Sequence, residues 1–264
     1  MISINAFKRA LQEDRQQIGL WCSLPGGYAA EIVAGSGYDW LLFDTEHSPG
    51  DPLTVLDQLQ AVAPYPTSAV VRPASNDAVL IKRFLDIGAQ TLLIPFVQDA
   101  QEARRAVAAT RYPPGGIRGV SGLTRATRFG RVKGYAARAS EEICVLVQVE
   151  TGEAIERIEE IAAVAGVDGV FVGPGDLAAS LGHLGELNHP AVVEAVENAI
   201  LRIRRCRKPA GILTTDPDFA ARCIALGSTF TAVAIDAGIL ARTSERILER
   251  FRAESSGGPS PSGG

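Results

Sequence analysis

Short apolar runs alternate with longer amphipathic stretches along nearly the whole chain, and this alternation constrains the fold more than any other feature. Several runs consist almost wholly of Val, Ile and Leu, which is typical of parallel strands buried on both faces. Eight such strands separated by helical patterns predict an α/β fold, the (β/α)8 or TIM barrel. The predicted strands are Ile18–Cys22, Asp39–Asp44, Ala69–Arg72, Thr91–Pro95, Val145–Glu150, Gly169–Val172, Ala210–Leu213 and Phe230–Val233.

Helical periodicity fills the intervals between these strands. A doubly wound open sheet is the structural alternative, but no GxGxxG follows the first strand, so the main sign of a dinucleotide-binding domain is missing. The clearest predicted helices are Leu53–Ala63, Ala78–Ile87, Ala100–Thr110, Ala154–Ala163, Ala191–Arg205 and Phe219–Leu226.

Three segments depart from the alternation. Residues Met1–Gln16 predict an extra helix before the barrel. Residues Tyr112–Glu142, rich in Gly and Arg, predict a long loop at the catalytic face and a helix near Tyr135–Ser140. Residues Ser255–Gly264 lack the means to pack and predict a disordered tail. Residues 1–254 are therefore interpreted as one barrel domain.

Composition excludes several classes of partner. A net charge of −4 favours neither nucleic acid nor an anionic membrane. No charge-free run reaches the length of a membrane span, and the charged N-terminus is unlike a secretory signal. The four cysteines are far apart and form no CxxC, which indicates reduced thiols in a cytoplasmic protein.

Two of the apolar runs end at carboxylates that lie 26 positions apart, Glu150 and Asp176. Successive strand ends of a parallel α/β fold meet on one face, so the pair can hold one hard divalent cation. The alternative is that both carboxylates only stabilise helix starts. Gln148 points the same way as Glu150, either towards a metal-bound water or as a core amide. The Gly173–Asp176 loop can bind a carboxylate through its backbone N–H groups.

The second strand runs into three ionisable residues, Asp44, Glu46 and His47. Asp44 can orient His47 as a His–Asp dyad that moves a proton, although a capped turn is the alternative. Arg72 closes the third strand and is costly to bury without an anionic partner. We expect it to stabilise negative charge on a substrate oxygen, with a salt bridge to Glu46 or Glu150 as the alternative. Together these residues predict metal-assisted enolate chemistry on a 2-oxo acid.

The same segments resemble the HpcH/HpaI aldolase family, and the resemblance extends over nearly the whole chain except the tail. A match of this length and order is more specific than any single motif. The matching segments are Ile18–Trp21, Gly37–His47, Leu59–Pro66, Val70–Pro73, Thr91–Gln98, Arg111–Val120, Cys144–Thr151, Asp168–Ala178 and Gly211–Leu213.

The resemblance implies a class II aldolase that uses Mg²⁺, Mn²⁺ or Co²⁺ in place of a Schiff-base lysine. Such an enzyme reversibly cleaves 4-hydroxy-2-oxo acids to pyruvate and an aldehyde. The resemblance also implies a homo-hexamer, a dimer of trimers in which neighbours exchange the last helix.

Residue roles follow from the resemblance by motif position. Glu150 and Asp176 match the metal ligands, Arg72 matches the arginine on the pyruvate oxygen, and Asp44 with His47 matches the dyad. Asp86 matches an aspartate that reaches a neighbour's site. Gln148, Gly175 and Asp176 match the pyruvate-binding groups, and Val120 and Leu213 match residues that shape the aldehyde pocket. Trp21 is a further predicted substrate-binding residue.

Two departures from the family concern the substrate. Thr45 and Gly175 stand where the family usually has Gly and Ala. The loss of a methyl group at Gly175 predicts a roomier pocket that accepts hydroxypyruvate. Alternative functions are a 2-keto-3-deoxy sugar-acid aldolase, a CoA-ester lyase and a non-catalytic barrel that only binds a 2-oxo acid. His183 and His189, in a Gly-, Asn- and Pro-rich loop, are given no role.

Overall fold

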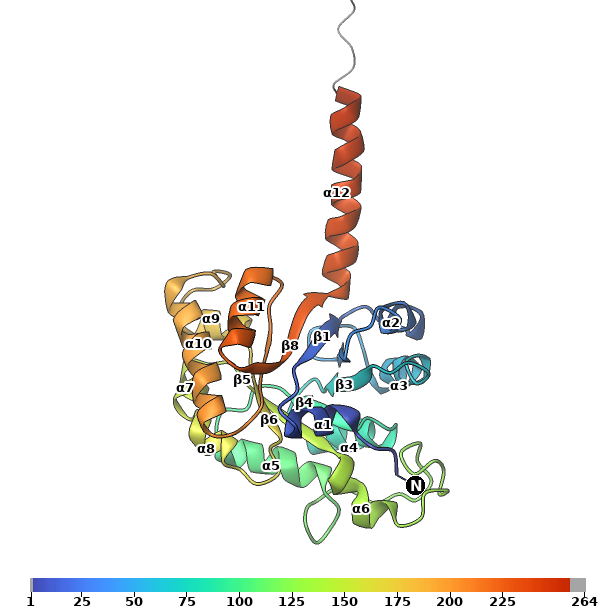
Figure 1. Ribbon diagram of the computed structural model, residues 1–264. Coiled ribbons are helices and arrows are strands. Elements are labelled where there is room, and N and C mark those ends of the chain that lie inside the picture. The colour runs from blue at the N-terminus through green and yellow to red at the C-terminus, as the bar shows by residue number, and fades with distance from the viewer. Residues whose placement is uncertain (1, 257–264) are drawn as a thin grey trace, which may run out of the picture.

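Eight parallel strands pair in chain order, and β1 also pairs with β8, so the sheet closes into a barrel (Figure 1). The structure is a computed structural model that describes residues 2–256. The predicted (β/α)8 barrel is confirmed, and closure excludes the open-sheet alternative. The strands are β1 Gln17–Cys22, β2 Trp40–Asp44, β3 Ser68–Arg72, β4 Thr91–Ile94, β5 Cys144–Val149, β6 Gly169–Val172, β7 Ala210–Leu213 and β8 Ser228–Ile235.

Helices cover the outside of the barrel, and aspartate caps begin several of them. The side chains of Asp51, Asp77, Asp99 and Asp216 each accept backbone N–H groups of the first turn. The helices are α1 Ala6–Gln12, α2 Gly27–Ala34, α3 Pro52–Ala61, α4 Ala78–Asp86, α5 Ala100–Thr110, α6 Tyr135–Glu142, α7 Gly152–Glu156, α8 Ile158–Ala162, α9 Pro174–Ser180, α10 Pro190–Arg205, α11 Pro217–Ala225 and α12 Asp236–Ser256.

Two helix predictions need comment. The helix predicted before the barrel is present as α1. The single helix predicted over Ala154–Ala163 is wrong, because Arg157 (φ −104°, ψ 15°) leaves the helical region and divides the segment into α7 and α8.

Aromatic side chains fill the interior of the barrel and its amino-terminal end. Phe7 of α1 packs against Trp40 and Phe230, with ring centroids 5.8 and 6.0 Å away. A Cβ at Gly19 or Gly211 would lie 2.1 Å from the Trp40 or Phe230 ring, so only glycine admits these rings. Because α1 covers the amino-terminal end, the carboxyl ends of the strands are left for a functional site.

The long insertion lies at the opposite end of the barrel from its predicted place. It follows helix α5 and leads into β5, so it connects a helix to the amino-terminal end of a strand. The Ala126 N–H donates to the Asp86 carbonyl (3.1 Å) and Arg125 donates to the Ile87 carbonyl (2.9 Å), both at the end of α4. The prediction that this loop sits at the catalytic face is therefore wrong, whereas its predicted helix is present as α6.

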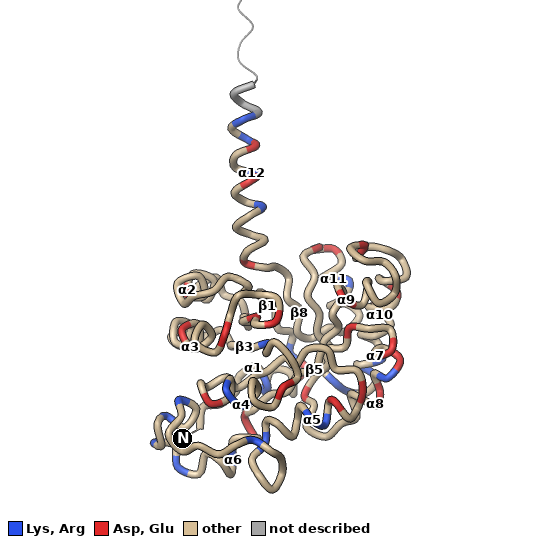
Figure 2. The backbone as a smooth tube through the Cα atoms, turned by 180° about the vertical axis from the view of Figure 1, so that it is seen from behind, with Lys and Arg blue, Asp and Glu red and all other residues tan. Residues whose placement is uncertain are grey.

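Helix α12 extends away from the barrel (Figure 1). Its apolar residues Ile239, Leu240, Ile247 and Leu248 are exposed, and charges of both signs are interspersed along it (Figure 2). The helix includes Ser255 and Ser256, which were predicted to begin the tail, and the rest of the predicted tail, 257–264, lies outside the described residues.

The four cysteines are free thiols, as predicted. Within residues 2–256, none of the helices combines the length and the apolar character needed to cross a membrane.

Candidate active site

The predicted polar residues gather at the carboxyl ends of neighbouring strands. Asp44 ends β2 and Arg72 ends β3, where the two are partners in the parallel ladder. Glu150 directly follows β5, and Asp176 lies in the first turn of α9, just after β6. This placement follows from the parallel topology and confirms that these side chains share one face of the barrel.

Arg72 is buried between two carboxylates. Its Nε and Nη2 donate to Asp44 Oδ1 and Oδ2 at 2.8 and 2.7 Å, and its Nη1 lies 2.7 Å from Glu46 Oε2. The guanidinium also stacks 4.6 Å from the centre of the Trp21 ring. The alternative of a salt bridge to Glu46 is therefore present in the structure. A guanidinium carries five N–H donors, so two remain for a substrate oxygen.

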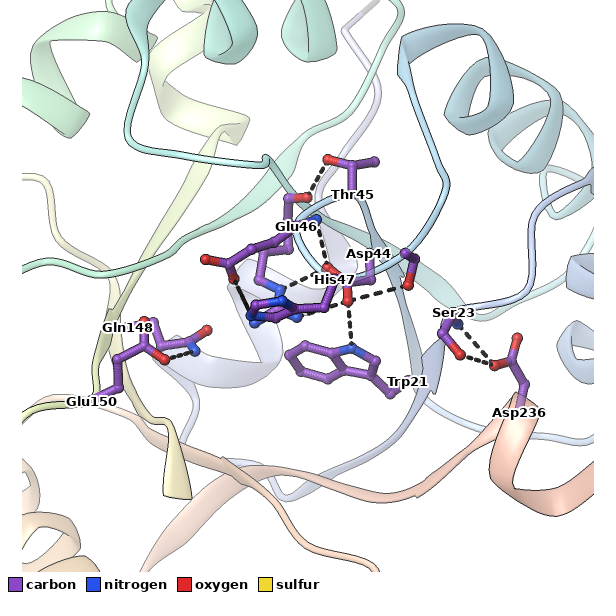
Figure 3. Close-up of polar contacts among 11 residues, drawn as sticks. Trp21, Ser23, Asp44, Thr45, Glu46, His47, Gln148, Glu150 and Asp236 are labelled. Carbon is purple, nitrogen blue, oxygen red and sulfur yellow. Dashed lines mark hydrogen bonds and ion pairs between the residues drawn. The ribbon is translucent and has the colours of Figure 1, made fainter. Parts of the chain in front are cut away.

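Asp44 binds Arg72 rather than His47. Its oxygens also accept from Trp21 Nε1 (3.3 Å, Figure 3), Ser48 Oγ (3.4 Å) and the Glu46 backbone N–H (3.0 Å). The predicted Asp44–His47 hydrogen bond does not form. The permanently charged, forked guanidinium matches a carboxylate with two bonds, which an imidazole cannot do.

The pKa of Asp44 reflects this pairing. Burial alone would raise it, but the hydrogen bonds and charge of Arg72 outweigh burial and hold the pKa of Asp44 below its ordinary value. Asp44 is therefore charged across the neutral range and keeps the guanidinium in place.

His47 lies at the mouth of the site, with 67% of its side chain exposed. Its Nε2 is 3.9 Å from Glu46 Oε2. Glu46 thus bridges Arg72 and His47, whereas only its salt bridge to Arg72 was predicted, as an alternative. Burial raises the pKa of Glu46, Arg72 lowers it, and the charges of Asp44 and Asp176 raise it.

Glu150 is buried and held at both oxygens. Oε1 accepts the backbone N–H of Phe96 (2.8 Å), and Oε2 accepts from Gln148 Nε2 (2.5 Å, Figure 3). The pKa of Glu150 is raised to about 7, mainly by burial, because burial and the charges of Glu46 and Asp176 outweigh the lowering by the two hydrogen bonds. Phe96 has a φ of 52°, rare for a residue with a side chain, and no sequence signal pointed to it.

The site fits a hard divalent cation. Glu150 and Asp176 supply carboxylate oxygens, and the Asp176 charge helps to raise the pKa of Glu150, a repulsion that a cation bound by both would relieve. The buried Gln148 Oε1 has no hydrogen-bond partner in the described chain. A Cβ at Gly173 would fall 2.6 Å from Glu150 Oε2 and 2.9 Å from Gln148 Nε2, so this cradle requires glycine.

The other predicted site residues divide between the two ends of the barrel. Trp21 lies at the site through its contacts with Asp44 and Arg72, and Leu213 ends β7 and packs against the barrel interior. Asp86 ends α4 at the far end, where Arg118 Nη2 donates to it (2.7 Å), and Val120 is 74% exposed in the insertion. Within one chain, Asp86 and Val120 therefore lie away from the candidate active site.

Comparison with known proteins adds independent findings. Residues 17–243 match the family described as HpcH/HpaI aldolase/citrate lyase. The chain is 66% identical over 250 residues to a pyruvate aldolase of Rhizobium etli, covering 95% of this chain and 98% of the relative. It is 55% identical over 251 residues to a 4-hydroxy-2-oxo-heptane-1,7-dioate aldolase of Salmonella arizonae, covering 95% of each.

A solved structure has the same fold. It is an HpcH/HpaI aldolase/citrate lyase family protein from Burkholderia cenocepacia, with a TM-score of 0.91 and 40% sequence identity, covering 94% of this chain and 99% of that one.

Proposed function

This chain belongs to the HpcH/HpaI aldolase/citrate lyase family, and from that premise we propose that it is a divalent-metal-dependent aldolase acting on 4-hydroxy-2-oxo acids. Family membership and aldolase-named relatives make it a carbon–carbon lyase. The observation that carries the proposal is the placement of Arg72, held by Asp44 and Glu46, on the same barrel face as the buried Glu150 and Asp176.

The proposed mechanism begins with binding of a 2-oxo acid. The backbone N–H groups of Gly175 and Asp176, in the first turn of α9, are the candidate donors to its carboxylate. The unpartnered amide oxygen of Gln148 can accept a hydrogen bond from a water molecule in the site. A divalent cation held by Glu150 and Asp176 would polarise the keto oxygen and lower the cost of forming the enolate.

Arg72 stabilises the charge that develops in the reaction. Its two remaining N–H donors can face the enolate oxygen, and burial beside Trp21 strengthens this interaction by excluding water. Since Asp44 fixes the guanidinium before substrate arrives, little reorganisation is needed at the moment of reaction.

His47 is the proposed proton-transfer group. It lies at the open mouth of the site beside Glu46, where an imidazole can exchange protons with water or substrate. Glu46 is the carboxylate next to the imidazole, the position that was predicted for Asp44.

The proposed substrates follow from the names of the relatives. Pyruvate is the expected 2-oxo acid product, and 4-hydroxy-2-oxo-heptane-1,7-dioate is the expected substrate for cleavage. Mg²⁺, Mn²⁺ and Co²⁺ are the expected cations, because carboxylate and amide oxygens form the site.

A homo-hexamer is the proposed assembly. The exposed apolar residues Ile239, Leu240, Ile247 and Leu248 give α12 a surface that a second copy of the chain can cover. Within one chain, Asp86 and Val120 lie at the end of the barrel opposite the candidate active site. In the hexamer they would complete the site of a neighbouring copy. Light scattering on the full chain tests this, and a monomer at micromolar concentration would contradict it.

Proton exchange at the methyl group of pyruvate in D₂O tests the function without knowledge of the aldehyde. Protein is stripped with a chelator and then supplied with Mg²⁺, Mn²⁺ or Co²⁺. We expect exchange only when the ion is restored, and loss of exchange in Glu150→Gln and Arg72→Ala. Absence of exchange with every ion would favour a CoA-linked substrate or a barrel that binds without reacting.

A further inference from the structure

We propose that His183, Glu186 and His189 form a second metal site, which binds a divalent transition ion of the Zn²⁺ class. One ligand atom from each side chain lies within 4.8 Å of the other two. Within residues 2–256, this is the one group of three or more His, Cys, Asp or Glu side chains whose ligand atoms converge in this way. The site is distinct from Glu150 and Asp176 and does not depend on the proposed aldolase function.

The spacing of the three residues explains why they meet. The Glu186 N–H donates to the His183 carbonyl, and the His189 N–H donates to the Glu186 carbonyl, both at 2.9 Å. Each turn brings residues i and i+3 close together, and in the first turn Gly185 takes the left-handed conformation (φ 81°) that such a turn favours. The two imidazole rings accordingly stack, with centroids 3.5 Å apart and planes 17° apart, and His183 Nδ1 lies 4.0 Å from Glu186 Oε2.

Both histidines are fixed by helix ends. At the end of α9, the Gly182 N–H donates to Ala179 and the His183 N–H donates to Ala178. This is a Schellman arrangement, with Gly182 in the left-handed region (φ 83°). His189 is the N-cap of α10. The loop between the two helices therefore holds its ligands on anchored backbone, which reduces the entropy lost on binding an ion.

The ligand types select the ion. Two imidazoles and one carboxylate suit Zn²⁺, Ni²⁺ or Cu²⁺, whereas Mg²⁺ prefers oxygen ligands only. Zinc–nitrogen bonds of about 2.0 Å put tetrahedral ligand atoms about 3.3 Å apart. An imidazole nitrogen binds an ion in the plane of its ring, so the two rings must turn out of their stacked arrangement before both can bind one ion. His183 and His189 are half-buried and Glu186 is exposed, which leaves them room to do so.

His189 Nδ1 accepts the Ala191 N–H at 3.3 Å, which is longer than a typical hydrogen bond and is therefore weak competition for an ion.

The consequence of ion binding for the enzyme concerns helix α9. Its first turn carries Gly175 and Asp176, and its last residues lead into the loop that holds His183, Glu186 and His189. An ion that clamps the end of α9 to the start of α10 restrains the helix that carries a proposed ligand of the first site.

Calorimetric titration with Zn²⁺ alone tests the proposal. The starting protein is the full chain with Glu150→Gln and Asp176→Asn, so that the carboxylate site is disabled and its properties cannot affect the result. We expect one equivalent of Zn²⁺ to bind. Addition of His183→Ala or Glu186→Gln should weaken binding by about tenfold or more, because one of three ligands is lost. Excess Mg²⁺ should not displace the ion.

Two further variants keep the result interpretable. His189→Asn retains a side-chain oxygen to cap α10 and removes the imidazole, so it should fold normally and lose Zn²⁺ binding. Glu194→Gln, an exposed residue in α10, should bind like the starting protein. Equal affinity in all variants, or no Zn²⁺ binding by the starting protein, would overturn the proposal.

Discussion

Asp44 binds Arg72 through both carboxylate oxygens, at 2.8 and 2.7 Å, where two neighbouring strands end. The two side chains are 2% and 7% exposed, so this ion pair is shielded from solvent. Such a pair fixes the direction of the guanidinium more firmly than a single contact can. We therefore propose that Asp44 is a positioning residue, which would act on the reaction through Arg72.

Asp44→Asn should lower both stability and activity. The change removes one of the two anionic partners of the buried Arg72, and Glu46 remains, so we expect a cost of up to about 3 kcal/mol in the free energy of unfolding. Chemical denaturation and kcat measured on the same protein check this. Glu141→Gln breaks an exposed ion pair with Arg138 and should cost less than about 1 kcal/mol, which makes it the control. Equal losses of stability and of kcat in the two variants would show that Asp44 does not position Arg72.

Metal affinity should fall in acid. The pKa of Glu150 is raised to about 7, mainly by burial, so below that pH a proton competes with the cation for the carboxylate. We expect the affinity for Mn²⁺ to drop by up to about tenfold for each pH unit below 7. Calorimetry in buffers of different ionisation enthalpy would detect the released proton. An affinity that does not change between about pH 6 and 8 would contradict this assignment.

The same shift gives a sign for stability without metal. Glu150 has a folded pKa above its ordinary value of 4.5, so its contribution to stability is present below that value and is lost as pH rises towards 7. In chelator, Glu150→Gln should therefore be more stable than the parent above pH about 7, and the two should converge in acid. Thermal unfolding across this range measures both curves.

His47→Ala should spare metal binding and lower the rate. The side chain is exposed at the mouth of the site and contacts Glu46 rather than Glu150, so its loss leaves the carboxylate site intact. If the imidazole moves the proton, kcat should fall by roughly 10²–10⁴-fold. Mn²⁺ titration and steady-state kinetics separate the two effects. Unchanged turnover would exclude His47 from proton transfer.

The sequence predicted the barrel and the strand ends because these depend on local patterns. The apolar runs that end at Asp44, Arg72 and Glu150 identify strands directly, and parallel topology then brings their ends together. The pairing of side chains was harder to predict. Asp44 was expected to bind His47, and Arg72 to bind substrate or else Glu46 or Glu150, but the register of β2 and β3 places Asp44 beside Arg72.

Long-range placement explains the other differences. The insertion had the composition of a functional loop, but its position after α5 places it at the amino-terminal end of the barrel. Asp86 and Val120 lie away from the site within one chain, and the roles we propose for them would need a neighbouring copy. Phe96 contributes only a backbone N–H to Glu150, which no side-chain pattern reveals.

Gly175→Ala should narrow the choice of 2-oxo acid. A Cβ at this position meets no atom of the chain within 4 Å, so the variant should fold normally. The added methyl group would face the bound substrate, and we expect the preference for pyruvate over hydroxypyruvate to rise by about tenfold. The ratio of kcat/KM for the two acids measures this. Equal ratios in the variant and the parent would show that Gly175 does not set the size of the pocket.

Gly173→Ala should weaken metal binding while the barrel stays folded. Its Cβ would lie 2.6 Å from Glu150 Oε2 and 2.9 Å from Gln148 Nε2, so both side chains must leave their present positions. These are the proposed metal ligand and its orienting amide, and displacement of such a partner typically costs about 10–100-fold in metal affinity. Gly175→Ala, two residues along the same turn, serves as the matched control, since it should retain metal affinity. Circular dichroism verifies the fold, and Mn²⁺ titration gives the result. Equal affinity in both variants would mean that the Glu150–Gln148 cradle does not hold the cation.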